Sequence, residues 1–141
     1  MIPLMPLAYR IDHDARIVLA LGSGIITDND VFAYQTDVWS RPEVAGYDEL
    51  IDMSLVTDIV APSGDRVRQL ATLSATMDDK DTTSRFAIVA QTDVAFGLGR
   101  MYQTYRALDR RSTKEVGVFR TMREAMAFLR RDTPPVMPKL T

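Results

Sequence analysis

Short apolar segments alternate with helical segments along most of the 141-residue chain. The clearest apolar segment is 85–90, where Phe86-Ala87-Ile88-Val89-Ala90 is almost continuously apolar, as in a strand covered on both faces. Leu50-Ile51-Asp52-Met53 and residues 116–119 predict two further strands, and a helical pattern follows each of the three. Because a strand, a helix and a second strand in succession require a right-handed crossover, this alternation predicts a largely parallel sheet.

The N-terminal part of the chain has the pattern of a β-hairpin. Residues 7–11 and 16–21 alternate apolar and polar side chains, and the turn formers of 12–15 separate them. We expect Gly22-Ser23-Gly24 to end the second strand. The predicted order is ββαβαβαβα, an α/β fold with a mixed, mostly parallel sheet. It forms a single domain over residues 1–131, and an irregular, Pro-rich tail follows over 132–141.

Cap residues mark the beginnings of four predicted helices. They are Thr27, Ser63, Thr92 or Asp93, and Thr121. The first helix is expected to reach about Ser40, and the last about Arg131. The third helix is expected to turn one apolar face to the sheet, made of Val94, Leu98, Met101, Tyr105 and Leu108. In the first helix, Gln35 falls within the apolar stripe, so it either bonds to backbone or water or marks a small cavity.

Composition excludes several classes of protein. The absence of cysteine excludes disulfides and thiol chemistry and favours a reducing cytoplasm. No apolar run approaches the roughly 20 residues that cross a bilayer, and residues 1–6 lack a basic signal-peptide start. The net charge of −2 argues against nucleic acid as a partner. We therefore expect a soluble cytoplasmic protein that binds neither nucleic acid nor membrane.

The charges are unevenly distributed along the chain. Residues 1–99 carry 7 basic and 15 acidic side chains, whereas residues 100–141 carry 10 basic and 4 acidic ones. This distribution indicates either internal pairing between the two segments, which we favour, or docking to an oppositely charged surface.

Four short stretches together resemble the SpoIIAA-like branch of the STAS superfamily, whose relatives include anti-sigma-factor antagonists. They are Tyr9-Arg10-Ile11-Asp12, Leu21-Gly22-Ser23-Gly24 through Thr27-Asp28, Leu50-Ile51-Asp52, and Asp93-Val94-Ala95-Phe96-Gly97 with Arg100-Met101-Tyr102. The resemblance covers roughly residues 5–131. It implies the fold of that family, and it extends distantly to lipid carriers of the CRAL-TRIO type.

The resemblance also bears on Ser63. In phosphorylatable STAS proteins, an Asp-Ser-Ser-Gly loop follows the strand that matches 50–53, and its second serine accepts phosphate. Ser63-Gly64 matches the end of that loop if one extra residue is allowed, but Ala61-Pro62 replaces the preceding Asp-Ser. Ser63 is therefore a possible phosphoacceptor, with an ordinary helix N-cap as the favoured alternative.

A contact surface is predicted on the outer face of the third helix. That face carries Phe96, Gly99, Arg100, Gln103 and Ala107, and small residues beside an exposed aromatic allow another backbone to approach closely. The alternative is that Phe96 folds back over the helix start. If the face is a contact surface, we expect a homodimer, because two-fold dimers are the commonest oligomers.

No catalytic or metal-binding group stands out. His13, the single histidine, lies between Asp12 and Asp14 in the predicted hairpin turn, where we interpret it as a turn residue. No metal site and no cofactor are expected. The ends of the strands near Asp52, Gln91 and Arg120 are the possible ligand region, since ligands of α/β sheets bind beyond the carboxyl ends of strands.

Two functions are compatible with these observations. The first is a non-enzymatic regulatory or protein-interaction domain, acting as a homodimer or with another protein partner. The alternative is a protein that binds a small, lipid-like apolar ligand, for which the eight methionines would supply an adaptable interior.

Overall fold

Five strands form one sheet in the computed structural model, which describes residues 6–60 and 63–139. In sheet order they are β1 Leu7–Asp12, β2 Ile17–Ile26, β3 Asp48–Ile59, β4 Ser84–Val89 and β5 Lys114–Phe119. β1 and β2 form the antiparallel hairpin, and every later strand runs parallel to its predecessor. The predicted order and the mixed, mostly parallel sheet are confirmed.

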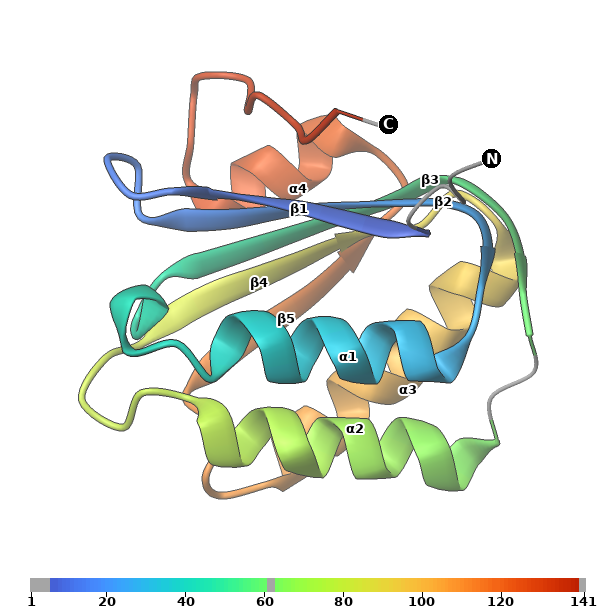
Figure 1. Ribbon diagram of the computed structural model, residues 1–141, viewed down its shortest axis with the longest axis horizontal. Coiled ribbons are helices and arrows are strands. Elements are labelled where there is room, and N and C mark those ends of the chain that lie inside the picture. Colours follow the sequence, from blue (N-terminus) through green and yellow to red (C-terminus); the bar gives the residue numbers. More distant parts are fainter. Residues whose placement is uncertain (1–5, 61–62, 140–141) are drawn as a thin grey trace.

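The helices cover both faces of this sheet. They are α1 Asp28–Trp39, α2 Gly64–Met77, α3 Asp93–Leu108 and α4 Met122–Leu129, and a 3-10 turn follows α1 at Pro42–Val44. Figure 1 shows α1, α2 and α3 on one side of the sheet and α4 on the other. The hydroxyls of Thr27, Ser63, Thr92 and Thr121 each accept a hydrogen bond from a backbone N–H of the first helical turn. The predicted caps are therefore correct, and they set where each helix begins.

Alternation along the strands builds two apolar cores. On β4, Phe86 and Ile88 face the three-helix side, whereas Ala87 and Val89 face α4. β2 divides its side chains in the same way, because successive side chains of a strand point to opposite faces. The three-helix side holds the larger core, and it also holds the candidate site.

β2 and β3 are both longer than predicted. Gly22-Ser23-Gly24 does not end β2, which continues to Ile26 through a register shift, and β3 continues to Ile59. Gly24 has a positive φ of 64°, and a Cβ on Gly22 would lie 2.8 Å from the Ile26 side chain. β4 pairs with β3 only as far as Asp52, so the ends of β2 and β3 form a two-stranded arm beyond the sheet. Pairing between the two strands outweighs the local glycine signal.

α3 is rotated relative to the prediction. Its buried residues are Ala95, Gly99, Tyr102 and Arg106. Three members of the predicted core face are instead exposed, Val94 by 64%, Met101 by 38% and Leu108 by 76%. A Cβ on Gly99 would lie 3.0 Å from Val118, so the small side of α3 lies against the sheet and allows the helix to approach it closely.

Residues 132–139 form no helix or strand, but they pack onto the domain. Met137 lies against the apolar core on the α4 side, and Pro138 is buried. The Arg10 guanidinium donates to the Val136 carbonyl oxygen at 3.0 Å. Among the described residues, no helix is both long enough and apolar enough to cross a membrane.

The two segments of opposite charge pair with one another inside the domain. Four cations of 100–141 contact acids of 1–99, in the pairs Arg106–Asp78, Lys114–Glu49, Arg120–Asp93 and Arg131–Asp48. These contacts support the interpretation of internal charge complementarity.

Candidate functional site

An apolar cavity of about 140 Å³ lies between the sheet and helices α1, α2 and α3. Its walls are almost entirely apolar. They include Ile51 and Met53 of β3, Val31 of α1, Val67 of α2 and Leu98 of α3. Ile51 and Val67 belong to the apolar core on the three-helix side, and Val31, Met53 and Leu98 pack against it. The cavity is thus lined by residues from α1, α2, α3 and strands β1 to β4.

Glu49 forms a polar end of this cavity. It is the second residue of β3 and is buried. Its Oε2 accepts hydrogen bonds from the Tyr34 hydroxyl at 2.8 Å and from the Trp39 indole N–H at 3.1 Å. Its Oε1 lies 3.2 Å from the ammonium of Lys114 on β5. Three donors therefore compensate the cost of burying this carboxylate.

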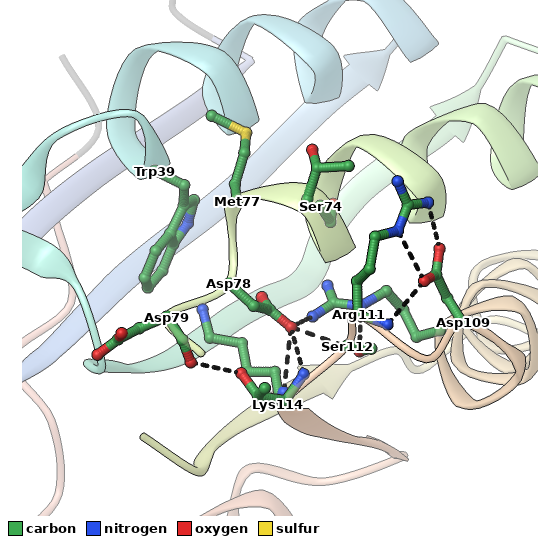
Figure 2. A network of polar contacts seen from close by, with 12 residues as sticks. Trp39, Ser74, Met77, Asp78, Asp79, Asp109, Arg111, Ser112 and Lys114 are labelled. Carbon is green, nitrogen blue, oxygen red and sulfur yellow. Dashed lines mark hydrogen bonds and ion pairs between the residues drawn. The ribbon is translucent and has the colours of Figure 1, made fainter. Parts of the chain in front are cut away.

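A second buried ion pair lies next to the first. The Asp78 carboxylate accepts from the Arg106 guanidinium at 2.6 Å and from the backbone N–H groups of Thr113 and Lys114. Figure 2 shows the contacts that converge on Asp78 from α3 and from the start of β5. Arg106 also donates to the Tyr102 hydroxyl. The end of α2, the end of α3 and the start of β5 are joined at this point.

Burial changes the titration of these groups. It raises the pKa of Tyr34 well above its usual value, and the charge of Glu49 adds to this effect. It raises the pKa of Tyr102 to about 12, although Arg106 acts in the opposite direction. For Lys114, burial lowers the pKa even though Glu49 and Asp78 favour its charged form. Both phenols are therefore neutral at ordinary pH, while the amine is easier to deprotonate than usual.

Arg66 spans the seam between the first turns of α1 and α2. Its Nε lies 2.7 Å from Asp28 Oδ2, its Nη2 donates to Asn29, and its guanidinium is 4.1 Å from the centre of the Phe32 ring. Arg66, Asp28 and Phe32 all line the cavity. Deeper in the same seam, Gln35 accepts from the Ser74 hydroxyl at 3.0 Å. Polar contacts thus connect α1 to α2 in front of an apolar interior.

A separate polar cleft of about 330 Å³ lies at the amino ends of the parallel strands. Trp39, Pro42, Gly46, Met77 and Lys114 are among the residues that line it, together with Asp78, Asp79 and Ser84. Lys114 borders this cleft, whereas its partner Glu49 lines the apolar cavity. The Glu49–Lys114 pair therefore lies between the two spaces.

The predicted ligand region is only partly assembled. Arg120 donates to the Gln91 carbonyl oxygen at 2.9 Å, so these two residues do meet. Asp52 accepts from the Ser54 backbone N–H, and it shares the α4-facing side of β3 with Leu50. Among the described residues, the walls of the apolar cavity and the polar cleft include none of the three. The space that could hold a ligand lies on the other face of the sheet from Asp52.

The predicted contact face on α3 is wrong in its orientation. Gly99 is buried against Val118, and Gln103 donates to the Val116 carbonyl oxygen at 2.8 Å. Phe96 is half-buried, and the Arg120 guanidinium lies 4.1 Å from the centre of its ring. Of the five residues of that face, only Arg100 and Ala107 are exposed. The five residues do not form one exposed surface, because the rotation of α3 turns Gly99 toward the sheet.

Ser63 and His13 have local structural partners. The Ser63 hydroxyl accepts from the Arg66 backbone N–H at 3.1 Å, as an N-cap does, and the side chain is exposed. The neighbouring Ala61 and Pro62 lie outside the described residues. His13 Nδ1 lies 2.9 Å from the Tyr47 hydroxyl at the hairpin turn. No three His, Cys, Asp or Glu side chains of the described residues are grouped in a way that could hold a metal ion.

Sequence reasoning missed the residues at the centre of the site. Glu49 shares a strand face with Ile51 and Met53, and Lys114 shares one with Val116 and Val118. Because alternate residues of a strand share a face, the apolar neighbours at every second position could have indicated that both charged side chains are buried. Gln35 was predicted either to bond to backbone or water or to mark a small cavity, and it does line the cavity. Its side chain bonds to the Ser74 hydroxyl and to the Met77 sulfur.

The sequence matches no protein-family model and no curated protein. Among solved structures it is similar to an uncharacterised protein of the DUF3478 family from Shewanella loihica PV-4, described as having a SpoIIAA-like fold. The match covers 92% of this chain and 97% of that one, with a TM-score of 0.55 and 17% sequence identity. The chain has a SpoIIAA-like fold. The resemblance inferred from its short stretches is thereby confirmed for the fold, and at this identity the similarity establishes the fold alone.

Proposed function

We propose that this SpoIIAA-like domain binds a small apolar molecule, or the apolar end of a larger one, and does not transform it. The observation that carries the proposal is the apolar cavity between the sheet and helices α1, α2 and α3. Its volume of about 140 Å³ is close to that of a known engineered apolar cavity of about 150 Å³ in another protein, which stays dry and takes up benzene or xenon.

The polar atoms at the cavity wall support an apolar ligand. The Tyr34 hydroxyl is bonded to Glu49, the Gln35 amide to Ser74 and Met77, and the Tyr102 hydroxyl to Arg106. Because these groups already have partners within the protein, a ligand needs to present only apolar surface to them. Binding then comes from burial of apolar area.

The seam bridged by Arg66 is the proposed entrance. Its ion pair with Asp28 and its stacking on Phe32 involve partly exposed side chains, and contacts of that kind contribute little to stability. Swinging Arg66 aside therefore costs little and exposes the apolar wall behind it.

The test uses fluorobenzene as the probe, detected by ¹⁹F NMR and by the thermal midpoint of the protein. We expect saturable binding and a midpoint that rises with probe concentration, because a ligand of the folded state stabilises it by mass action. Val67→Phe fills the cavity wall and should abolish both effects. Val94→Phe, at an exposed position outside the cavity, should leave them unchanged. The proposal is contradicted if the wild-type protein shows neither saturable binding of fluorobenzene nor a rise in its thermal midpoint.

A homodimeric interaction domain is the second candidate, favoured by the exposed apolar stripe on α3. Val94, Met101 and Leu108 repeat every seven residues, the spacing of a helix-pairing seam. In the proposed dimer, the interface is therefore formed by Val94, Met101 and Leu108 and not by the face that carries Phe96.

Sedimentation at about 100 μM tests the dimer, since that concentration is far above a micromolar dissociation constant. We expect a dimeric wild type, and Met101→Glu should dissociate it by placing two like charges near the two-fold axis. Ala107→Glu is the matched control, because Ala107 is exposed on another side of the same helix. A monomeric wild type contradicts this candidate and leaves the ligand proposal intact.

A further inference from the structure

Lys114 differs from the other lysines of the chain in its surroundings. The chain has three lysines, and Lys80 and Lys139 are exposed to solvent. The side chain of Lys114 is only 6% exposed, and its amine lies 3.1 Å from the centre of the Trp39 ring. Among the described residues, the amine has one hydrogen-bond acceptor, Glu49, although an ammonium has three N–H donors.

Lys114 borders the polar cleft, through which small molecules would reach its amine. The cleft measures about 330 Å³, at the lower end of the range for ligand pockets. Lys114 and Trp39 both line it, and Figure 2 shows the two side chains next to each other. A small carbonyl compound in the cleft would therefore lie near both the indole and the amine that sits against it.

The charges around Lys114 suit a nucleophilic amine. Burial lowers its pKa, and the Arg106 charge acts in the same direction, whereas Glu49 and Asp78 act against it. Glu49 is also the nearest base for the ammonium proton, at 3.2 Å. A neutral amine is the reactive form of lysine, so each unit by which the pKa falls raises the reactive fraction about tenfold.

We propose that Lys114 is a nucleophilic lysine that forms an imine with a small aldehyde or ketone bound in the polar cleft. The ammonium first gives a proton to the Glu49 carboxylate. The amine lone pair then attacks the carbonyl carbon, the C=O π electrons move to the oxygen, and a proton passes from the nitrogen to that oxygen to give a neutral carbinolamine. Glu49 returns its proton to the hydroxyl group, which leaves as water. Loss of water leaves the C=N bond, so that amine and carbonyl compound become imine and water with no change of oxidation state.

This site is separate from the apolar cavity, and the proposal does not depend on ligand binding there. Its test compares the three lysines within one folded wild-type molecule. The full chain is incubated with benzaldehyde and sodium cyanoborohydride at pH 7, which converts an imine into a stable secondary amine, and the labelled positions are mapped by peptide mass spectrometry. The same reaction in concentrated urea serves as the control for intrinsic reactivity and peptide detection.

We expect Lys114 to be labelled at least about tenfold faster than Lys80 and Lys139 in the folded protein, and all three equally in urea. Glu49→Gln removes the negative charge that favours the ammonium form, so it should lower the pKa of Lys114 further and speed its labelling, while leaving the other two lysines unchanged. Circular dichroism checks that this variant is folded. Labelling confined to Lys80 and Lys139 would overturn the proposal, because a purely structural Lys114 stays protected in the folded state.

Discussion

Two tyrosines, Tyr34 and Tyr102, have their pKa raised because the fold buries their phenol groups. The Tyr34 and Tyr102 hydroxyls each contact a charged side chain of the buried network, Glu49 and Arg106 respectively. Burial raises the pKa of both phenols, that of Tyr102 to about 12. An acid whose pKa is raised by folding stabilises the folded state fully below its unfolded pKa. That contribution is lost as the pH rises toward the folded value.

Tyr102 should therefore make the protein sensitive to alkali. Between pH 10 and about 12, the unfolded chain releases the Tyr102 proton while the folded protein keeps it. The free energy of unfolding should fall by about 1.4 kcal/mol per pH unit from this group alone. Urea unfolding at pH 9 and at pH 11 measures the fall. Tyr102→Phe should show a shallower decrease than the wild type, and an identical decrease in both would contradict the assignment.

At the scale of elements, α3 illustrates how packing sets the phase of a helix. Large apolar side chains recur on one side of it, yet the side with Ala95 and Gly99 lies on the sheet. Gly99 lies close to Val118 and Ile88, whereas a Cβ on Gly97 would meet no side chain or other packed atom within 4 Å. The two glycines of one helix are thus in opposite environments.

Substituting each glycine by alanine tests this phase. Gly97→Ala should stabilise the protein by about 0.5–1 kcal/mol, because alanine is the better helix former and has room here. Gly99→Ala should destabilise it by about 1–2 kcal/mol, because the new methyl group presses on Val118. Urea unfolding of the two variants beside the wild type gives both values. If both substitutions changed the free energy of unfolding equally and in the same direction, the orientation of α3 described here would be wrong.

At the scale of the whole molecule, the two sheet faces are covered unequally. Three helices cover one face, whereas α4 shares the other with the tail (Figure 1). Residues 132–139 of the tail lack regular structure, but Met137 and the Arg10–Val136 contact attach this segment to the domain. A segment attached in this way contributes to stability although it forms no helix or strand.

Truncation after Arg131 should therefore lower the free energy of unfolding by about 1–2 kcal/mol, since it uncovers the apolar surface under Met137. The truncated chain should keep its far-ultraviolet circular dichroism, because residues 132–139 contain no helix or strand. Met137→Ala is a smaller change at the same contact and should give part of the loss. An unchanged urea midpoint in both variants would show that the tail contributes nothing.

The sequence alone determined the features that depend on neighbours along the chain. The hairpin, the alternation of strands and helices, and the four caps follow from side-chain periodicity and from hydrogen bonds over three residues. Such local preferences act in the same way in whatever fold the segment adopts, so they could be inferred before the structure. They are sufficient to give the SpoIIAA-like order of elements.

Only the tertiary structure decided the arm of β2 and β3, the rotation of α3 and the site itself. Gly22 continues a strand because Val56 and Ile26 pack against it, and Gly99 faces inward because Val118 is there. Glu49 and Lys114 are 65 positions apart in the sequence, and each is acceptable inside the protein because the other is its partner. Such choices depend on contacts between distant residues, and a cavity is the space that those contacts leave unfilled.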